Sequence, residues 1–529
     1  MYFASHGLPF LTVDVRGRGN SEGEFHPMIQ EAKDGYDVVE WLAKQPYCNG
    51  KVSMWGGSYA GYDQWAAAKE FPPHLATIVP VASPYAGVDF PMFGNLFAPY
   101  DMQWLTFTSG HTGQEVIFGD SAFWASRFLR WFEAGEPFAK LDEVIGNPSS
   151  IFQEWVAHPH PDAYWDSYNP TTAEYAKISI PILTITGSHD GDQPGALQHY
   201  KVFMANAAPA AKERHYLIIG PWDHAGTRTP NTQFGGLSLG PKTLLDIPKL
   251  HMQWYAWTMQ DGPKPEFLKK PVAYYVINAD RWRYADSLAA ITGDTRTLYL
   301  GSVSNATDPY HSGSLDSAPA TGKPDHYVYD PKDLGTGHLE SVIDSSSLVD
   351  QRMLFAQQGK ELIYHSAPFE KDTEISGFFK LSAWISLDQP DTDFTVTVYE
   401  IGQDGSSIPL SSDQMRARYR ESSREPKFVR SKAPLRYDFD HFTFVSQEVK
   451  AGSRLRVVIA PVNSIFGEKN YNSDGVVAQE SMKDARSVTV SLYHDKAHPS
   501  ALYVPLGRPA AADELHAPES MFTAPKRAD

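Results

Sequence analysis

Short apolar segments alternate with helical patterns over residues 1–86 of the chain. Strand-like segments lie at 8–15, 52–55 and 77–82, and helical spacings of apolar residues occupy the intervals between them. Parallel strands need a long crossover between them, usually a helix, and such a sheet is covered by helices on both faces. This part of the chain therefore predicts an α/β fold, with functional side chains at the carboxyl ends of the strands.

An aromatic-rich stretch interrupts this alternation. Residues 87–176 are rich in Phe, Trp, Tyr and Met, and they contain helical patterns but no strand of convincing length. The alternation resumes with strand patterns at 178–186 and 216–219, each followed by a helical pattern. We therefore expect one domain made of residues 1–86 and 177–270, with a helical cap inserted at 87–176.

The character of the chain changes after residue 270. Short strand patterns, such as 394–398 and 455–459, are separated by clusters of Gly, Ser, Asp and Pro. Many short strands with turn-rich spacers are typical of an all-β sandwich or jelly roll. A single hydrophobic core stops growing at roughly 250 to 300 residues, so a chain of 529 residues needs more than one domain. We predict a separate all-β domain over residues 271–529.

Composition excludes several classes of function. The chain has 46 Lys and Arg against 63 Asp and Glu, a net charge of −17, which disfavours a nucleic-acid partner. Its single cysteine, Cys48, excludes an intrachain disulfide and does not suggest a zinc site. No apolar stretch is long enough for a membrane helix, so we expect no membrane partner. Compartment and homo-oligomerisation stay open.

The sharpest chemical signal lies at residues 55–61, WGGSYAG, where a predicted strand meets a predicted helix. A serine on such a sharp turn is a nucleophile elbow, and it needs small neighbours two positions away on each side, here Gly56 and Ala60. We predict that Ser58 is a nucleophile and that the backbone N–H of Tyr59 stabilises an oxyanion. The alternative interpretation is a Gly-Ser turn that only caps a helix.

A serine nucleophile needs a carboxylate and a base, and in this fold they follow it along the chain in the order Ser, Asp, His. Asp190 lies just after the strand pattern at 178–186, and His224 lies just after the one at 216–219. Both therefore reach the same edge of a parallel sheet as Ser58. Four residues compete for these roles: Asp192 and Asp223 as the carboxylate, and His189 and His251 as the base. Alone, Asp190 could be a turn residue and His224 a loop residue.

At these motifs the chain resembles the cocaine esterase and α-amino-acid ester hydrolase group (CocE/NonD), which is related to X-prolyl dipeptidyl peptidases. Segment 56–61 looks like the nucleophile motif of the group, and Asp190 and His224 fall in segments similar to its acid and base motifs. The resemblance implies an α/β-hydrolase fold with an inserted helical cap and a C-terminal jelly roll of the galactose-binding-like type. The triad mechanism needs no metal or other cofactor, and nothing in the sequence suggests one.

The start of the chain departs from this group. Its members carry further residues ahead of the matching segment, including early strands and a tyrosine that completes the oxyanion hole. We find no match for that tyrosine, and Tyr2 lies too late in the pattern. We therefore expect a shortened chain with one uncovered sheet edge and one oxyanion donor fewer.

These observations predict a serine hydrolase that cleaves ester or amide bonds of small molecules through an acyl-enzyme intermediate. Activity of the X-Pro dipeptidyl-peptidase or β-lactam acylase type is an alternative, and a non-catalytic carbohydrate-binding protein is an alternative of another class. Asp192 lies where related ester hydrolases place a pocket residue, so we hypothesise that it binds a substrate ammonium group. The competing interpretation is that Asp192 caps the following helix.

Overall fold

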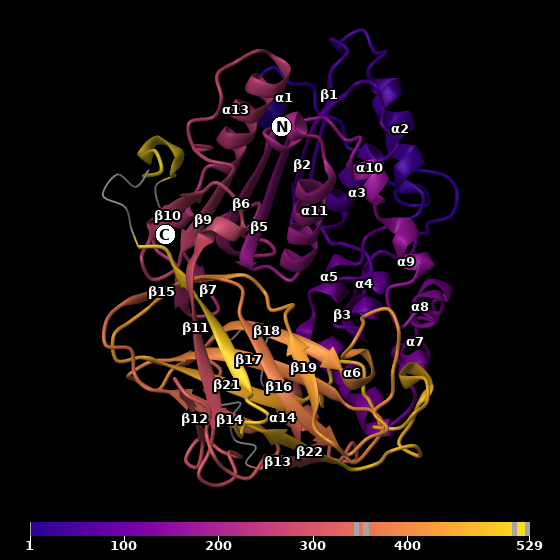
Figure 1. The fold of residues 1–529 in the computed structure, drawn as a ribbon. Coiled ribbons are helices and arrows are strands. Elements are labelled where there is room, and N and C mark those ends of the chain that lie inside the picture. Colours follow the sequence, from indigo (N-terminus) through magenta and orange to yellow (C-terminus); the bar gives the residue numbers. More distant parts are fainter. Residues whose placement is uncertain (1, 343–348, 353–358, 510–515, 524–529) are drawn as a thin grey trace.

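The computed structural model describes residues 2–342, 349–352, 359–509 and 516–523. Figure 1 shows an upper part, in which helices flank a twisted sheet, and a lower part built of orange and yellow strands. Helices from the middle of the first half of the chain lie along one side, next to the lower strands. Among the described residues, no helix combines the length and the apolar character that crossing a bilayer requires.

A six-stranded sheet forms the centre of the α/β domain, as predicted. Its order is β1-β2-β5-β6-β9-β10; the first five strands are parallel and β10 is antiparallel to β9. The strands are β1 (Val52–Gly57), β2 (Leu75–Val81), β5 (Ile182–His189), β6 (His215–Asp223), β9 (Val272–Val276) and β10 (Arg281–Ala285). The long helices of this domain are α2 (Glu31–Leu42), α3 (Tyr59–Ala68), α11 (Gln193–Asn206) and α13 (Ile247–Met259).

Buried side chains of the strands alternate between the two faces of this sheet. On one face Val79 and Ile185 share a core with Trp254 of α13. On the other face Ile78 packs in a core with Trp65 of α3. Strands covered on both faces read as continuous apolar runs, which explains why the sequence pattern located them. The sheet also continues through β9 and β10 beyond residue 270, where we had placed the end of this domain.

The strand predicted at residues 8–15 is wrong. This segment has no strand pairing in the structure, and Phe10, Leu11 and Val13 remain 46%, 47% and 51% exposed. The first strand of the sheet is β1, and among the described residues it pairs only with β2. An apolar run becomes a strand only where a neighbouring strand satisfies its backbone groups, and among the described residues no strand pairs with residues 8–15. A short helix, α1 (Tyr2–Ser5), precedes the segment.

The predicted helical insertion contains several helices around an aromatic core. Trp124, Trp131, Trp155 and Phe152 are almost completely buried there. The elements are β3 (Met92–Phe93), β4 (Leu96–Phe97), α4 (Tyr100–Phe107), α5 (Glu115–Phe118), α6 (Ser121–Ala134), α7 (Leu141–Ile145), α8 (Ser150–Val156), α9 (Ala163–Tyr168) and α10 (Thr172–Tyr175). Only one two-stranded pair, β3 with β4, occurs among them.

Thirteen strands form the C-terminal β-rich domain, and their inward-facing side chains share one core. The strands are β11 (Thr292–Gly301), β12 (Gly313–Asp316), β13 (Asp325–Tyr329), β14 (Leu362–Ser366), β15 (Thr373–Gly377), β16 (Lys380–Leu387), β17 (Asp393–Ile401), β18 (Ser407–Arg416), β19 (Leu435–Phe439), β20 (Val445–Val449), β21 (Arg454–Pro461), β22 (Val488–Tyr493) and β23 (Ala501–Gly507). The helix α14 (Gly335–Val342) packs on α6 of the cap. The predicted all-β character is confirmed.

The β domain is attached to the α/β domain through polar contacts. The side chain of Gln193, at the start of α11, donates to the carbonyl of Phe444 at 3.1 Å and accepts from its N–H at 2.6 Å. Arg283 of β10 pairs with Glu374 of β15 at 2.7 Å, and the arginine is buried. The Gln193 contact holds the β domain against residues 190–192, the acidic loop directly before α11.

Residues 516–523 return from the β domain to the α/β domain. The N–H of Asp246 donates to the carbonyl of Met521 at 2.8 Å, and Nζ of Lys249 donates to that of Ser520 at 2.7 Å. The side chain of Met521 is buried in the core that contains Leu245 and α13. The segment therefore completes the packing of the α/β domain.

The contribution of a buried ion network to the stability of the β domain can be measured. Arg416 binds Asp393 through two hydrogen bonds of 2.9 and 3.0 Å and Glu468 through one of 2.7 Å. Arg416→Met leaves two buried carboxylates without their cation, so we expect a loss of about 3–5 kcal/mol in the free energy of unfolding by urea titration. The control, Arg436→Met, removes an exposed pair with Asp438 and should cost less than about 1 kcal/mol. Equal losses would contradict this prediction.

Candidate active site

Ser58 has a backbone conformation that is rare for a residue with a side chain. Its φ of 63° and ψ of −131° lie outside the regions that L-residues normally occupy, and such a conformation costs on the order of 1–3 kcal/mol. The neighbouring structure holds it in place. Its N–H donates to Val81 of β2 at 2.9 Å, and its carbonyl accepts from Gly61 at 2.7 Å. Strain at this point is typical of a functional residue.

Small residues permit the turn at Ser58. A Cβ on Gly56 would lie 2.6 Å from the Cβ of Ala60, and one on Gly61 would lie 2.8 Å from the carbonyl oxygen of Val81. Both distances are too short for non-bonded atoms, so α3 can lie this close to β1 and β2 only with glycine at these positions. Among the described residues, no hydrogen bond reaches Oγ of Ser58, which leaves the hydroxyl available to a substrate or a base.

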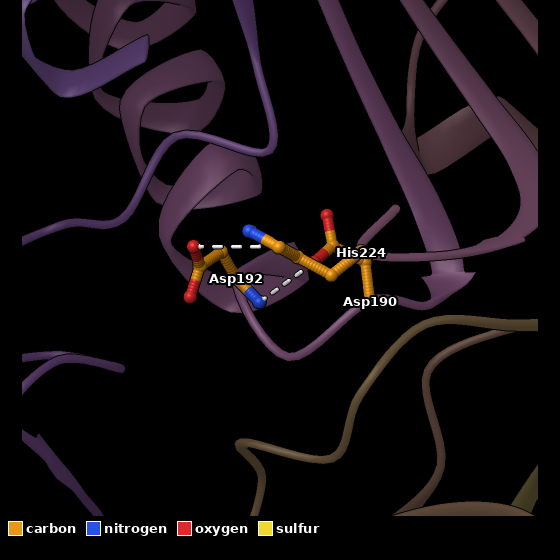
Figure 2. Close-up of side chains that lie close together, drawn as sticks. All are labelled: Asp190, Asp192 and His224. Carbon is orange, nitrogen blue, oxygen red and sulfur yellow. Dashed lines mark hydrogen bonds and ion pairs between the residues drawn. The ribbon is translucent and has the colours of Figure 1, made fainter. Parts of the chain in front are cut away.

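Asp190 and His224 meet at the carboxyl ends of β5 and β6 (Figure 2). Nδ1 of His224 donates to Oδ1 of Asp190 at 2.8 Å, and Thr186 donates to the other carboxylate oxygen at 3.2 Å. The Asp190 side chain is fully buried, whereas that of His224 is 39% exposed. Because the proton sits on Nδ1, Nε2 of His224 carries a free lone pair that can accept a proton.

Neighbouring charges set the proton affinity of His224. Burial lowers the pKa of His224, but the hydrogen bond and the charge of Asp190 outweigh it and raise the pKa above its ordinary value. Asp192 raises the pKa further and Arg228 lowers it. The imidazolium is therefore stabilised most strongly by Asp190.

Asp192 lies directly before α11, at the N-cap position, but its side chain makes no capping hydrogen bond. Its carboxylate is instead 3.7 Å from Nδ1 of His224, and its side chain is 21% exposed. Burial, followed by the charges of Asp190 and Asp89, raises the pKa of Asp192. The side chain of Asp192 therefore faces His224 and does not cap α11, and its role toward a substrate stays a prediction.

The same cluster has donor atoms that suit a metal ion. One ligand atom each from Asp190, Asp192 and His224 lies within 4.8 Å of the others. In this structure, however, Nδ1 of His224 donates its proton to Asp190, and a metal ligand would need that nitrogen deprotonated. The contacts describe a hydrogen-bonded pair between His224 and Asp190.

Two residues near this cluster were missed from the sequence. Asp89 accepts from the backbone N–H of Tyr85 at 2.8 Å and of Gly195 at 2.5 Å, and burial raises its pKa to about 7. The guanidinium of Arg228 lies against Gly57, where a Cβ would be 2.2 Å from Nη1. Within the described part of the chain, this Nη1 is buried without a hydrogen-bond partner. Neither residue belongs to a recognisable motif, so only the folded chain brings them to the site.

The competing candidates have other partners. Nδ1 of His189 donates to the carbonyl of Pro221 at 2.9 Å, and burial lowers its pKa. Oδ1 of Asp223 accepts from the N–H of Gly226 at 2.7 Å within its own turn. His251 is buried in α13 against Trp55, with ring centroids 5.5 Å apart. None of the three lies in the Asp190–His224 pair.

Tyr59 is the first residue of α3. The first N–H groups of a helix have no acceptor within the helix, so its N–H is available to an oxyanion. The phenol is held elsewhere, since it donates to the carboxylate of Glu31. The oxyanion role of this N–H stays a prediction.

Residues 1–226 match the X-Pro dipeptidyl-peptidase (S15 family), and residues 265–502 match the X-Pro dipeptidyl-peptidase C-terminal non-catalytic domain. The chain belongs to the S15-related serine hydrolases. It is 24% identical to the cocaine esterase of Rhodococcus sp. (strain MB1 Bresler) over 535 residues, which covers 95% of this chain and 89% of that protein. The predicted CocE/NonD resemblance is confirmed, and a non-catalytic carbohydrate-binding protein is not supported.

Solved structures share the fold over nearly the whole chain. An aminopeptidase from a marine sediment archaeon, Thaumarchaeota archaeon, superimposes with a TM-score of 0.78 at 22% identity, covering 94% of this chain and 84% of that one. An α-amino acid ester hydrolase superimposes with a TM-score of 0.77 at 21% identity, covering 93% and 84%. The α/β-hydrolase fold with a β-rich C-terminal domain is thereby confirmed.

Removing the charge of Asp190 should change the titration of His224. In Asp190→Asn the largest raising influence is lost while burial remains, so we expect the pKa of His224 to fall relative to the wild type. The imidazole would then stay neutral at a lower pH. NMR titration of the histidine ring measures this shift directly. Asp223→Asn is the matched control, and an equal shift in both variants would contradict the pairing.

Proposed function

We propose that this serine hydrolase cleaves ester or amide bonds of small molecules with Ser58 as nucleophile, His224 as general base and Asp190 as the residue that orients the base. Oγ of Ser58 attacks the carbonyl carbon while Nε2 of His224 takes its proton. The bond to the leaving group then breaks, and the leaving oxygen or nitrogen receives that proton. Water, activated by His224 in turn, releases the acid from Ser58.

The observation that carries this proposal is the 2.8 Å hydrogen bond from Nδ1 of His224 to Oδ1 of Asp190. It fixes the tautomer in which Nε2 is the acceptor, and that is the form a general base needs. Ser58 supports the proposal independently, because its strained backbone presents the hydroxyl at the end of β1. The N–H of Tyr59 is our proposed donor to the oxyanion.

Acidic groups near the base favour a substrate that carries an ammonium group. Asp192 faces His224 rather than capping α11, and Asp89 lies within electrostatic reach of Asp192. A bound cation would stabilise the ionised form of both carboxylates, whose pKa values are raised by burial. Relatives of this chain include an α-amino acid ester hydrolase and an aminopeptidase. We therefore propose α-amino esters, or amides with a free amino group, as substrates.

A peptidase or β-lactam acylase uses the same steps on an amide bond. The leaving amine must then be protonated by His224 before it departs. Relative values of kcat/KM on an ester and an amide with the same acyl group separate the esterase from these alternatives.

Fluorophosphonate labelling followed by peptide mapping tests the nucleophile. We expect the probe to modify Ser58, the Ser58→Ala variant to lose labelling and hydrolysis, and Asp190→Asn to lower kcat by about 10³- to 10⁴-fold because the base loses its tautomer. Ser188→Ala, which removes a buried hydroxyl two residues before Asp190 in the sequence, is the control and should retain labelling. Labelling that persists in Ser58→Ala would assign the nucleophile to another residue.

Asp192→Asn tests the substrate class separately. The variant keeps the shape of the side chain but loses the charge, so we expect the preference in kcat/KM for an α-amino ester over its N-acetylated form to fall by about 10- to 100-fold. Hydrolysis of the N-acetylated ester should stay close to wild type. An unchanged preference would refute the role of Asp192 and leave the roles of Ser58 and His224 untouched.

A further inference from the structure

The first turn of α11 follows the acidic loop 190–192 directly. The first N–H groups of a helix have no acceptor within the helix, so other groups must supply one. The N–H of Gln193 donates to the carbonyl of Asp190 at 3.1 Å, and Pro194 has no N–H. The next donor, the N–H of Gly195, is one that the side chain of an N-cap residue normally accepts. Its partner therefore decides how the start of the helix is held.

Asp89, from the chain segment that enters the cap insertion, accepts this N–H. Its Oδ2 accepts from Gly195 at 2.5 Å, and its Oδ1 accepts from the N–H of Tyr85 at 2.8 Å. The side chain of Asp192, the N-cap residue itself, makes no capping hydrogen bond. Helix α11 is thus capped by a carboxylate from a distant segment. This allows the carboxylate of Asp192 to lie 3.7 Å from Nδ1 of His224 instead.

This contact requires glycine at position 195. A Cβ there would lie 2.3 Å from Oδ2 of Asp89 and 2.4 Å from the backbone nitrogen of Tyr85. Both distances are well below van der Waals contact, so a larger residue would push the segment that carries Asp89 away from α11. The close approach explains why a residue of low helix propensity lies in the first turn.

The segment that carries Asp89 is held from the other end of the cap insertion. The side chain of Asn169, which follows α9 directly, accepts from the N–H of Ala86 at 3.2 Å and donates to its carbonyl at 2.8 Å. Trp165 of α9 packs on Gly87, where a Cβ would lie 2.9 Å from the Cβ of the tryptophan. Both Asn169 and Trp165 are buried. The two ends of the cap insertion are therefore joined, and together they fix the position of Asp89.

Hydrogen bonds connect the turn capped by Asp89 to the proposed catalytic carboxylate. The N–H of Ala196 donates to the carbonyl of Asp192 at 3.0 Å. The N–H of Asp192 in turn donates to Oδ1 of Asp190 at 3.1 Å. The same oxygen accepts Nδ1 of His224 at 2.8 Å. A movement of the first turn of α11 would therefore shift Asp190 relative to His224.

We propose that Asp89 is a positioning residue of the active site: by capping α11 from the cap insertion, it holds Asp190 in hydrogen-bonding geometry with His224. Each of its oxygens already accepts a main-chain N–H, so Asp89 acts through α11 and not by contact with a substrate. The inference rests on the proposed function, because it concerns the same carboxylate and the same base. It gives the cap insertion a part in the catalytic geometry.

Asp89→Asn tests this role. The amide keeps the size of the side chain, but it accepts only one of the two N–H groups and turns its own NH2 toward the other. We expect kcat to fall by about tenfold to a hundredfold, because small displacements of catalytic groups have effects of this size. Hydrogen exchange at the amide of Gly195 or Tyr85 should become faster. The pKa of His224, measured by NMR titration, should fall because Asp190 pairs with it less well.

The direction of this pKa change separates geometry from charge. The charge of Asp89 raises the pKa of Asp192, so removing that charge makes Asp192 easier to ionise. An ionised Asp192 raises the pKa of His224. Loss of charge alone would therefore raise the pKa of His224, whereas a disturbed hydrogen bond to Asp190 lowers it.

Gly195→Ala tests the same contact with the charge of Asp89 retained. Its Cβ collides with Asp89, so we expect kcat and the pKa of His224 to fall as in Asp89→Asn. This variant decides the question if Asp89→Asn does not fold. Asp142→Asn is the matched control: Asp142 is a buried carboxylate of the cap insertion that accepts the N–H of Glu143 at 2.8 Å and of Ser149 at 2.9 Å. It should leave kcat and the pKa of His224 at their wild-type values.

A positioning residue and a substrate ligand differ in their dependence on the substrate. Positioning lowers kcat by the same factor for an α-amino ester and for its N-acetylated form. A loss confined to the α-amino ester would make Asp89 a substrate ligand and overturn the proposal. A wild-type pKa of His224 in both Asp89→Asn and Gly195→Ala would also overturn it. Hydrolysis that persists in Ser58→Ala would instead contradict the proposed function, since the NMR and exchange measurements do not depend on turnover.

Discussion

A hydrogen bond of 2.8 Å between His224 and Asp190 links the ends of two adjacent parallel strands. It depends on the register of β5 and β6, in which Gly187 lies opposite Gly220 and the pairing shifts before His189 meets Asp223. A slip of one residue would turn one of the two side chains to the other face of the sheet. The register of this strand pair therefore decides whether the base has its carboxylate.

The β domain contributes to the same arrangement from outside. Gln193 follows Asp192 directly. Its side chain makes two hydrogen bonds to the backbone of Phe444, which is a residue of the β domain. The start of α11, and with it the acidic loop, is thus held by a strand-rich domain that carries none of the proposed catalytic residues. A substitution at this contact would act on the proposed base through the position of Asp190, which makes Gln193 a positioning residue.

Features of the structure that depend on a local sequence pattern could be predicted from the sequence. The strands β2, β5 and β6 are buried on both faces, so their sequences are continuous apolar runs. The glycines around Ser58 are required because a larger side chain would not fit. Both patterns can be recognised in the sequence. Residues 8–15 show the limit of this reasoning, because an apolar run does not reveal whether a partner strand is present. Asp89 and Arg228 were missed for a related reason: their neighbours come from distant segments that only the folded chain brings together.

The return of residues 516–523 to the α/β domain changes how the two domains are connected. The chain leaves the six-stranded sheet after Ala285, forms the whole β domain, and then delivers Met521 into the core beneath α13. In topological terms the β domain is an insertion within the α/β domain rather than an appendage after it. A single cut between the domains therefore cannot yield an intact α/β domain. The C-terminal piece removed by such a cut would contain Met521, which is part of the hydrophobic core of the α/β domain.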